Sequence, residues 1–288
     1  MKLTDINIRD PYVLVHEGKY YLYGTRGPSC WGEGTGFDVY VSEDLETWSD
    51  PIEIFRNDGR FWATHNYWAP EVHVWKGAFY MFASFKAEDV CRCTWILRAD
   101  SPLGPFVPHS DGPITPADWE CLDGTFHVDQ AGKPWMVFCH EWKQVFDGEI
   151  CAVRMKDDLT GPIGEPQLLF RASAADWVVP CRYIDGKPGY VTDGPFMWRC
   201  EDGTLLMLWA SFSGEGDYTE GLARSTNGGI TGNFEQVDPL FMKDGGHGMV
   251  FRTLDGRLMM TLHSPNRTLE ERPFFFEVEE KDGLLRRK

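Results

Sequence analysis

Long apolar runs are absent from this sequence of 288 residues: no stretch approaches the roughly 18 consecutive apolar residues that a membrane-spanning helix needs. The first residues also lack the apolar core of a signal peptide, so we expect a cytoplasmic protein. Basic residues are scarce, 28 Lys and Arg against 44 Asp and Glu, which gives a formal net charge of −16. This charge argues against nucleic acid and anionic membranes as partners, but not against a neutral ligand such as a sugar.

Paired cysteine motifs are missing as well. The eight cysteines are scattered and several lie inside apolar runs, so we expect reduced thiols that are mostly buried. Cys91 and Cys93 are too close in sequence for a useful metal pair, and no second pair accompanies them. The sequence therefore does not predict a zinc site.

Linkers and low-complexity segments are also absent, which favours a single domain over residues 1–288. Aromatic residues make up 14% of the chain, and 30 Gly and 18 Pro accompany them. This composition favours many short strands joined by tight turns over long helices. Three polar segments are expected to form loops on the rim of the fold: residues 87–90, 144–148 and 213–220.

A repeated pattern organises the chain. Residues 7–24 read as a β-hairpin, in which Asp10 opens an apolar run that turns at Gly18 and returns. The pattern recurs four more times, and the five polar residues that open the repeats are Asp10, Glu71, Asp123, Asp193 and His247. Their spacing of 52 to 70 residues fits propeller blades of three or four strands, whereas a sandwich has no such long period. We predict an all-β, five-bladed β-propeller. The five polar residues that open the repeats, called the polar heads below, should meet at one end of its central channel.

Several carboxylates around one cavity suggest acid–base hydrolysis. An ionised Asp can activate water while a second carboxyl with a raised pKa protonates the leaving oxygen, and a third acid nearby raises the pKa of that donor. An inverting glycosidase holds its acid and base about 6.5–9.5 Å apart, with water between them. Aromatic rings near the mouth would suit sugar faces, although core packing must account for most of the 12 tryptophans. The candidates are Trp31, Trp68, Trp119, Trp142, Trp177, Trp209 and Phe85.

Each polar residue also has a structural interpretation. Asp favours strand ends and turns, so the three aspartates could be turn formers. Glu71 could be a channel-wall carboxylate paired with Arg9 or another base, and Glu141 could be a rim residue. His247 lies between glycines, where the backbone can approach closely. It could bind a channel ion or a water cluster, or simply hydrogen-bond the acids.

Four motifs resemble those of glycoside hydrolase family 43, the five-bladed propeller glycosidases of arabinan and xylan breakdown. Arg9-Asp10-Pro11 matches the first-blade motif, whose Asp is the general base, and Trp68-Ala69-Pro70-Glu71 matches the second-blade motif. Leu122-Asp123-Gly124-Thr125-Phe126 resembles the third-blade motif, whose Asp orients the acid and tunes its pKa. Residues 42–48 resemble the outer turn Ser-x-Asp-Leu-x-x-Trp. The likeness covers nearly the whole chain in order.

The fourth-blade motif departs from the family pattern. The family has Glu-Gly-Pro, with Glu as general acid, where this chain has Asp193-Gly194-Pro195. Asp193 is our first choice for the acid and Glu141 the second; Glu71 could also supply the proton, or the activity could be altered or lost. The Gly-Gly-His-Gly sequence around His247 resembles a fifth-blade position where some members place a histidine against a central calcium or water cluster. The resemblance thus implies no cofactor for the chemistry, with a structural calcium as an option.

We expect an inverting glycosidase that acts on short plant-derived oligosaccharides. Terminal α-L-arabinofuranosyl residues are the first choice of substrate and β-xylosides the second. Asp10, Asp123 and Asp193 are the expected catalytic residues, and Arg9 and Trp68 are candidates for substrate binding. The rival hypotheses are a non-catalytic sugar-binding propeller and another five-bladed enzyme family, such as a furanosidase for a different sugar or a glycoside phosphorylase.

Overall fold

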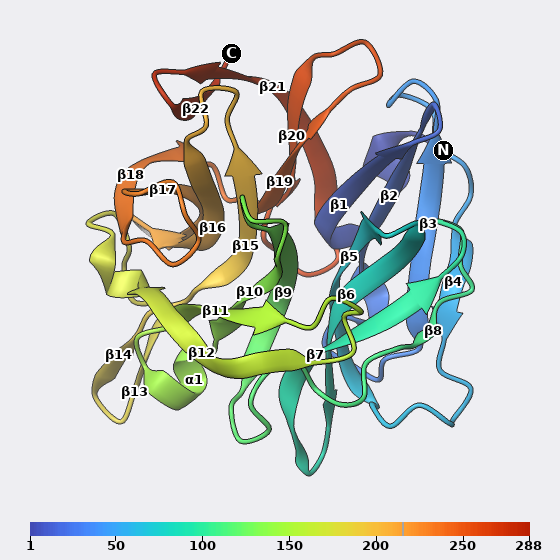
Figure 1. The fold of residues 1–288 in the computed structure, drawn as a ribbon, viewed down its shortest axis with the longest axis horizontal. Coiled ribbons are helices and arrows are strands. Elements are labelled where there is room, and N and C mark those ends of the chain that lie inside the picture. Colours follow the sequence, from blue (N-terminus) through green and yellow to red (C-terminus); the bar gives the residue numbers. More distant parts are fainter. Residues whose placement is uncertain (215) are drawn as a thin grey trace.

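A computed structural model describes residues 1–214 and 216–288 and confirms the five-bladed β-propeller (Figure 1). Blade I consists of β1 (Ile8–His16), β2 (Lys19–Arg26), β3 (Gly36–Ser42) and β4 (Ile52–Arg56). Blade II consists of β5 (His65–Trp75), β6 (Ala78–Ala87), β7 (Val90–Ala99) and β8 (Val107–Pro108). Blade III consists of β9 (Cys121–Val128), β10 (Pro134–His140), β11 (Glu149–Met155) and β12 (Pro162–Arg171).

The remaining blades follow the same plan. Blade IV consists of β15 (Asp193–Arg199), β16 (Leu205–Ser213), β17 (Asp217–Ser225) and β18 (Phe234–Phe241). Blade V consists of β19 (Gly246–Arg252), β20 (Leu258–Ser264), β21 (Arg272–Lys281) and β22 (Leu284–Arg287). Outside the blades lie η1 (Leu3–Asp5), η2 (Gly27–Ser29), α1 (Trp142–Val145), η3 (Ala172–Ala174) and the hairpin β13 (Arg182–Ile184) and β14 (Lys187–Gly189).

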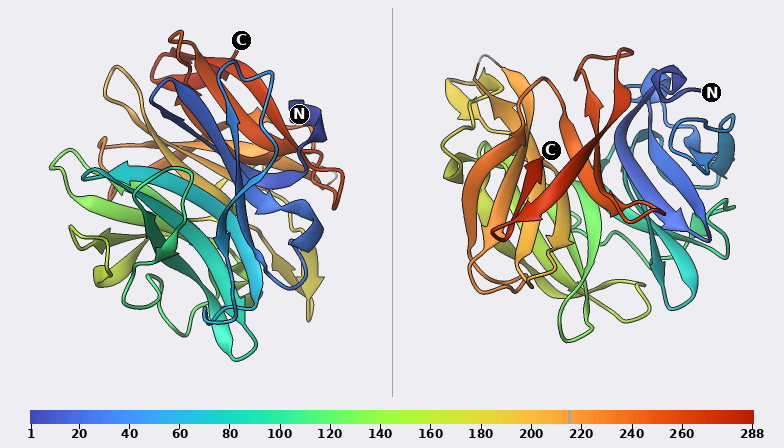
Figure 2. Two further views of the ribbon diagram at one scale, coloured as in Figure 1. Left: turned by 90° about the vertical axis from the view of Figure 1, so that its right-hand side faces the viewer. Right: turned by 90° about the horizontal axis from the view of Figure 1, so that it is seen from above.

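Each blade is a four-stranded antiparallel sheet made of strands that are consecutive in sequence. The first strand of every blade, β1, β5, β9, β15 or β19, lies innermost around the axis, and the later strands lie progressively further out (Figures 1 and 2). Among the described residues, no helix has the length and apolar character to cross a membrane.

The three predicted rim loops have different outcomes. Residues 87–90 form the tight turn between β6 and β7, as expected. Residues 144–148 begin inside α1 and are a loop only beyond it. The prediction of a loop at residues 213–220 is wrong at the end of the segment, because residues 217–220 begin strand β17. Glu215, in the middle of the segment, lies outside the described residues. Tyr218 and Glu220 are buried there, because residues 218–223 of this strand are covered on both faces.

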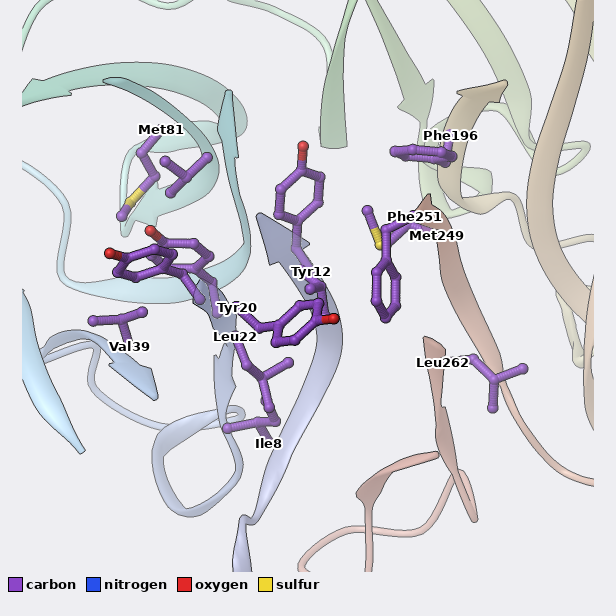
Figure 3. Packing of buried hydrophobic residues seen from close by; sticks show 14 of the residues in the cluster. Ile8, Tyr12, Tyr20, Leu22, Val39, Met81, Phe196, Met249, Phe251 and Leu262 are labelled. Carbon is purple, nitrogen blue, oxygen red and sulfur yellow. The ribbon is translucent and has the colours of Figure 1, made fainter. Parts of the chain in front are cut away.

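Buried aromatic and aliphatic side chains from several blades pack together in one cluster (Figure 3). Tyr12 of β1 lies edge-on to Phe196 of β15, with ring centroids 6.4 Å apart, and so connects two blades that are not neighbours. Tyr20 and Phe251 make a similar contact between blades I and V at 6.3 Å. Each such pair adds about 0.5–1.5 kcal/mol beyond simple burial. This packing confines the polar site to one end of the channel.

Every innermost strand has a bulge at its head, where its pairing with the next strand is interrupted. In each bulge one residue has a left-handed backbone: Asp10 (φ 52°), Ala69 (φ 45°), Asp123 (φ 58°), Gly194 (φ 49°) and His247 (φ 55°). Bulges bend a strand and re-aim its side chains, and they are common beside active sites. Five equivalent bulges thus place five residues in a ring around the channel mouth.

The bulges show that the five polar heads are not equivalent. Asp10, Asp123 and His247 occupy the left-handed position, but blades II and IV have Ala69 and Gly194 there. Glu71 therefore lies two residues after the left-handed residue of its strand, Ala69. Asp193 lies one residue before the left-handed residue of its strand, Gly194. The sequence predicted that all five heads meet at one end of the channel, but it did not predict their different positions relative to the bulges, because these depend on the backbone conformation.

Candidate active site

A cavity of about 430 Å³ lies at the bulged end of the channel. Of the residues proposed for the site from sequence, all but one line it: Arg9, Asp10, Trp68, Asp123, Glu141, Asp193 and His247. The exception is Glu71, which lies deeper in the channel. Its Oε2 accepts a hydrogen bond from Thr125 (2.6 Å) and lies 2.9 Å from Nε2 of His73.

Asp10 is held as a carboxylate. Thr25 donates its hydroxyl to Oδ2 at 2.6 Å, and Oδ1 lies 3.2 Å from Nδ1 of His247. Burial by itself would raise the pKa of Asp10, but the positive charges of His247 and Arg9 more than offset it. The pKa of Asp10 therefore lies below its ordinary value, and the side chain is ionised near neutral pH.

His263 fixes the backbone of Asp10. The Asp10 N–H donates to Nδ1 of His263 at 3.2 Å, which places the proton of this ring on Nε2, toward Asn266 (3.2 Å). Burial, with a further contribution from the charge of Arg9, lowers the pKa of His263 to about 3. The ring is neutral and gives the strained Asp10 backbone an acceptor.

Asp123 faces both Asp10 and the fourth blade. Its N–H donates to Ser84 Oγ at 2.9 Å, and its Oδ2 accepts the N–H of Gly194 at 3.0 Å. Burial, together with the charge of Asp10, raises the pKa of Asp123 to about 6, although the charge of His247 opposes this change. The hydrogen bond between Gly194 and Asp123 therefore connects the bulge of blade IV to the bulge of blade III.

Asp193 has the most strongly raised pKa of the three aspartates. Burial and the negative charge of Asp123 raise the pKa of Asp193 to about 7, while His247 and a hydrogen bond from Tyr218 act in the opposite direction. That bond runs from the Tyr218 hydroxyl to Oδ2 at 3.0 Å. A carboxyl that keeps its proton close to neutral pH can act as a proton donor.

His247 lies close to the carboxylates of Asp10 and Asp123. Its Nδ1 is 3.2 Å from Oδ1 of Asp10 and 3.7 Å from Oδ2 of Asp123. Burial would lower the pKa of His247, but the surrounding carboxylates raise it above its ordinary value. A positive imidazolium is favoured there, and it helps to keep Asp10 ionised.

Aromatic and cationic groups form one wall of the cavity. Trp31 is 59% exposed and is held by an edge-on contact with Trp68 (5.3 Å) and a hydrogen bond from its N–H to Thr268 (3.0 Å). The Arg9 guanidinium lies 5.4 Å from the Trp31 ring and pairs with Glu271 at 2.7 Å. A rigid, exposed indole is a suitable surface for the apolar face of a sugar.

Glu141 also lines the cavity and belongs to a buried ion pair. Its Oε2 accepts from Arg92 at 2.7 Å, and its Oε1 lies 3.1 Å from Nζ of Lys143. Arg92 in turn lies over the ring of Trp68 at 4.4 Å. Because both oxygens of Glu141 contact cations, the arrangement suits a structural or substrate-contacting role better than delivery of a proton.

The predicted aromatic lining divides into two groups. Trp31, Trp68 and Trp142 line the cavity. The others pack elsewhere: Trp119 stacks on His140 at 4.1 Å, Trp177 and Trp209 pack on each other at 5.0 Å, and Phe85 is fully buried. Core packing therefore accounts for the second group.

Sequence reasoning missed three buried polar residues around the acids: Tyr218, Glu220 and His263. Tyr218 and Glu220 lie in a segment that reads as a polar loop, and His263 follows an apolar run without any motif. Glu220 accepts the N–H of Gly248 at 3.0 Å, and burial raises the pKa of Glu220 to about 8.

His247 is the candidate for contact with a central calcium. Ca²⁺ prefers six to eight oxygen ligands, whereas His247 presents a nitrogen that faces two carboxylates. Within residues 1–214 and 216–288, no three His, Cys, Asp or Glu side chains are placed to hold a metal together. The side chains do not form a calcium cage, so the structural calcium stays a prediction and no chemical step is assigned to it.

A family model described as "Glycosyl hydrolases family 43" matches residues 4–283. The chain belongs to glycoside hydrolase family 43. The resemblance inferred from the four motifs is thereby confirmed, as is the prediction of a glycosidase with a carbohydrate substrate. The family's propeller also agrees with the five blades of the structure.

This family 43 chain is similar to an endo-arabinase, an arabinofuranosidase and a xylanase. An endo-arabinase structure from Bacteroides thetaiotaomicron VPI-5482 is 41% identical, with a TM-score of 0.91 over 98% of both chains. An extracellular exo-alpha-(1->5)-L-arabinofuranosidase, ArbA, from Cellvibrio japonicus is 24% identical over 90% of this chain and 79% of its own length. An endo-1,4-beta-xylanase structure from Bacteroides thetaiotaomicron shares the fold, with a TM-score of 0.78, 24% identity, and coverage of 98% of this chain and 94% of the xylanase.

The comparison with ArbA contradicts the predicted cytoplasmic location, because that relative is extracellular. That prediction rested on the missing signal peptide, and the expected reduced thiols do not distinguish the compartments either. All eight cysteines are free, and burial raises the pKa of several thiols, that of Cys93 to about 12. Buried thiols with such high pKa values react slowly whether the surroundings are reducing or oxidising.

Proposed function

We propose that this family 43 glycosidase is an inverting enzyme that removes pentosyl units from plant-derived oligosaccharides. Asp10 acts as general base, Asp193 as general acid, and Asp123 raises the pKa of the acid and orients it. The observation that carries this assignment is the opposite effect of the site on two aspartates that line one cavity: the pKa of Asp10 is lowered and that of Asp193 is raised to about 7. One carboxyl is therefore ready to accept a proton and the other to give one.

The chemical step is a single displacement by water. Asp10 takes a proton from the attacking water, the oxygen of that water bonds to the anomeric carbon, and the glycosidic C–O bond breaks. Asp193 gives its proton to the leaving oxygen, so that the leaving sugar departs as a neutral alcohol. Asp10 ends protonated and Asp193 ionised, and exchange with solvent restores both.

An α-L-arabinofuranoside is the first choice of substrate. Support comes from the 41% identity to the endo-arabinase and from the arabinofuranosidase relative. The second candidate is a β-xyloside, which is supported by a relative from Bacteroides ovatus described as a xylosidase/arabinosidase, 25% identical over 41% of this chain. The exposed ring of Trp31 and the guanidinium of Arg9, which both line the cavity, suit a polyhydroxylated ring in either case.

The test is a panel of aryl α-L-arabinofuranosides and β-xylosides with good and poor leaving groups. We expect Asp10→Asn to lower kcat at least about 100-fold on every substrate that the enzyme turns over. Asp193→Asn should lower kcat about 100-fold on poor leaving groups and far less on activated ones, because an activated oxygen needs little protonation. Asp89→Asn, in the exposed turn after β6, is the matched control.

Two further readouts can contradict the assignment. Proton NMR of the first-formed sugar should show the anomer opposite to that of the substrate, and the same anomer would exclude inversion. On poor leaving groups the wild-type rate should fall as pH rises through about 7, where Asp193 loses its proton, and the residual rate of Asp193→Asn should lack that fall. Unchanged rates of Asp193→Asn on poor leaving groups would move the acid role to another residue.

A further inference from the structure

The acid of this site has a short side chain, so its orientation matters. A protonated carboxyl carries its proton on one of two oxygens, and only a proton that faces the leaving oxygen can be transferred. Asp193 lies one residue before the left-handed Gly194, whose N–H donates to Asp123 at 3.0 Å. These contacts fix the backbone of the acid, but they do not decide which of its oxygens is protonated.

A hydrogen bond from Tyr218 can decide which oxygen of Asp193 carries the proton. Its hydroxyl lies 3.0 Å from Oδ2 of Asp193, and no other acceptor in the described part of the chain is hydrogen-bonded to it. The phenol therefore donates to Oδ2, which occupies that oxygen as an acceptor. When Asp193 is protonated, its proton is left on Oδ1.

Tyr218 is itself rigidly held. The side chain is 1% exposed, its ring stacks on His263 with centroids 5.4 Å apart, and its carbonyl accepts the N–H of Gly245 at 2.8 Å. A Cβ at Gly246 would lie 2.8 Å from the ring, so this glycine gives the tyrosine its space. A donor fixed on three sides can orient a carboxyl without moving during the reaction.

The same stack connects the acid to the base. His263 lies against the ring of Tyr218, and its Nδ1 accepts the N–H of Asp10 at 3.2 Å. A single row of contacts thus runs from Asp193 through Tyr218 and His263 to Asp10. The row fixes the two catalytic carboxyls of blades I and IV relative to each other.

We propose that Tyr218 is a positioning residue for the acid, which selects Oδ1 of Asp193 as the oxygen that delivers the proton; this step rests on the proposed role of Asp193. During the reaction the Oδ1 proton moves to the glycosidic oxygen as its bond to the anomeric carbon breaks, and Asp193 becomes a carboxylate. The Tyr218 hydroxyl then donates to a charged oxygen, which is a stronger hydrogen bond than the one in the ground state. Tyr218 therefore stabilises the transition state more than the bound substrate.

Tyr218→Phe tests this role, because it removes the hydroxyl and keeps the ring on His263. We expect kcat to fall about 10-fold on poor leaving groups and less than about 2-fold on activated ones, with KM nearly unchanged. Tyr23→Phe is the matched control, since Tyr23 is equally buried and its hydroxyl donates to the Pro102 carbonyl at 2.8 Å, away from the acids. It should lose a buried hydrogen bond without any dependence on the leaving group.

A double variant separates the two assignments. If Tyr218 acts through Asp193, then Tyr218→Phe combined with Asp193→Asn should be no slower on poor leaving groups than Asp193→Asn alone. Losses that multiply, an equal fall on good and poor leaving groups, or no fall at all for Tyr218→Phe would overturn the role of Tyr218 and leave Asp193 as the acid. No effect of Asp193→Asn itself would overturn both.

Discussion

Asp10 and Asp193 carry the same carboxyl group, yet their surroundings shift their pKa values in opposite directions. Both lie in a poorly solvated position, which by itself raises a carboxyl pKa. Asp10 gains the positive charges of His247 and Arg9, whereas Asp193 faces the negative charge of Asp123. At the scale of single residues, the chemistry of the site is therefore set by neighbours more than by residue type.

Glu220 provides a prediction at this scale because burial raises its pKa from 4.5 to about 8. Between these values the folded protein keeps a proton on Glu220 that the unfolded chain has lost. The stability that this group contributes is therefore full below its unfolded pKa and is lost as pH rises toward 8. Glu220→Gln, which cannot titrate, should show a smaller fall in the free energy of unfolding between about pH 5.5 and about pH 8.5 than the wild type.

Urea denaturation at several pH values measures this difference. Asp123 and Asp193 titrate in both proteins, so the difference between the two curves isolates Glu220. Glu43→Gln is the control, because the Glu43 side chain is 75% exposed and its removal should leave the pH dependence unchanged. Parallel curves for the wild type and Glu220→Gln would mean that Glu220 is ionised in the folded protein.

At the scale of the strand, the bulge is the element that creates the site. A regular β-strand directs alternate side chains to the two faces of its sheet, and a left-handed residue interrupts this alternation. Each of the five inner strands has such a left-handed residue near its start. In three strands this residue is titratable: Asp10, Asp123 and His247. Glycine in blade IV allows close contact with the histidine of blade V.

Gly194→Ala should disrupt that contact. The new Cβ would lie 2.6 Å from the His247 ring and would occupy a left-handed backbone at φ 49°. Gly203→Ala is the matched control in the turn after β15, where φ is 91° and no atom lies within 4 Å of the added carbon. We expect the control to lose about 1 kcal/mol from backbone strain with unchanged kcat.

For Gly194→Ala we expect a larger loss of stability and a fall in kcat of at least about 10-fold, because the clash displaces His247 from Asp10. Chemical denaturation and kcat on an activated substrate measure the two effects. If Gly194→Ala behaved like Gly203→Ala in both measurements, close packing of the fourth and fifth bulges would not be needed for activity.

At the scale of the whole molecule, the ring closes between blades I and V without a shared blade. Every blade takes its four strands from one stretch of sequence, so the two ends of the chain meet through side chains. Asn7 donates to the Glu271 carbonyl at 2.9 Å, Arg9 pairs with the Glu271 carboxylate at 2.7 Å, and Arg272 donates to the Thr4 carbonyl at 2.8 Å. These contacts lie beside the cavity that Arg9 lines.

The Arg9–Glu271 pair gives a prediction for closure, since the Glu271 side chain is only 1% exposed. Arg9→Met leaves that carboxylate buried without its partner and should lower the free energy of unfolding by about 3–5 kcal/mol. Adding Glu271→Leu should recover most of the loss, because the unpaired buried charge is then gone. Urea denaturation of the two single variants and the double variant measures the coupling.

The exposed pair of Arg267 and Glu270 is the control, and its removal should change stability by less than about 1 kcal/mol. An additive cycle for Arg9 and Glu271, with no recovery in the double variant, would show that their ion pair does not hold the ends of the ring together.

The fold and the family follow from the sequence alone, which also singles out three aspartates that line one cavity. Repeats of short apolar strands, each opened by a polar residue and closed by a glycine turn, leave few architectures other than a propeller, because each strand must bury its apolar side chains against the next blade. The tertiary structure decided the rest. The bulges, which depend on local backbone conformation, separate Glu71 from the cavity and bring Asp10, Asp123 and His247 together. Burial and neighbouring charges come from distant segments, and they set the opposite pKa values of Asp10 and Asp193 and bring Tyr218 to the acid.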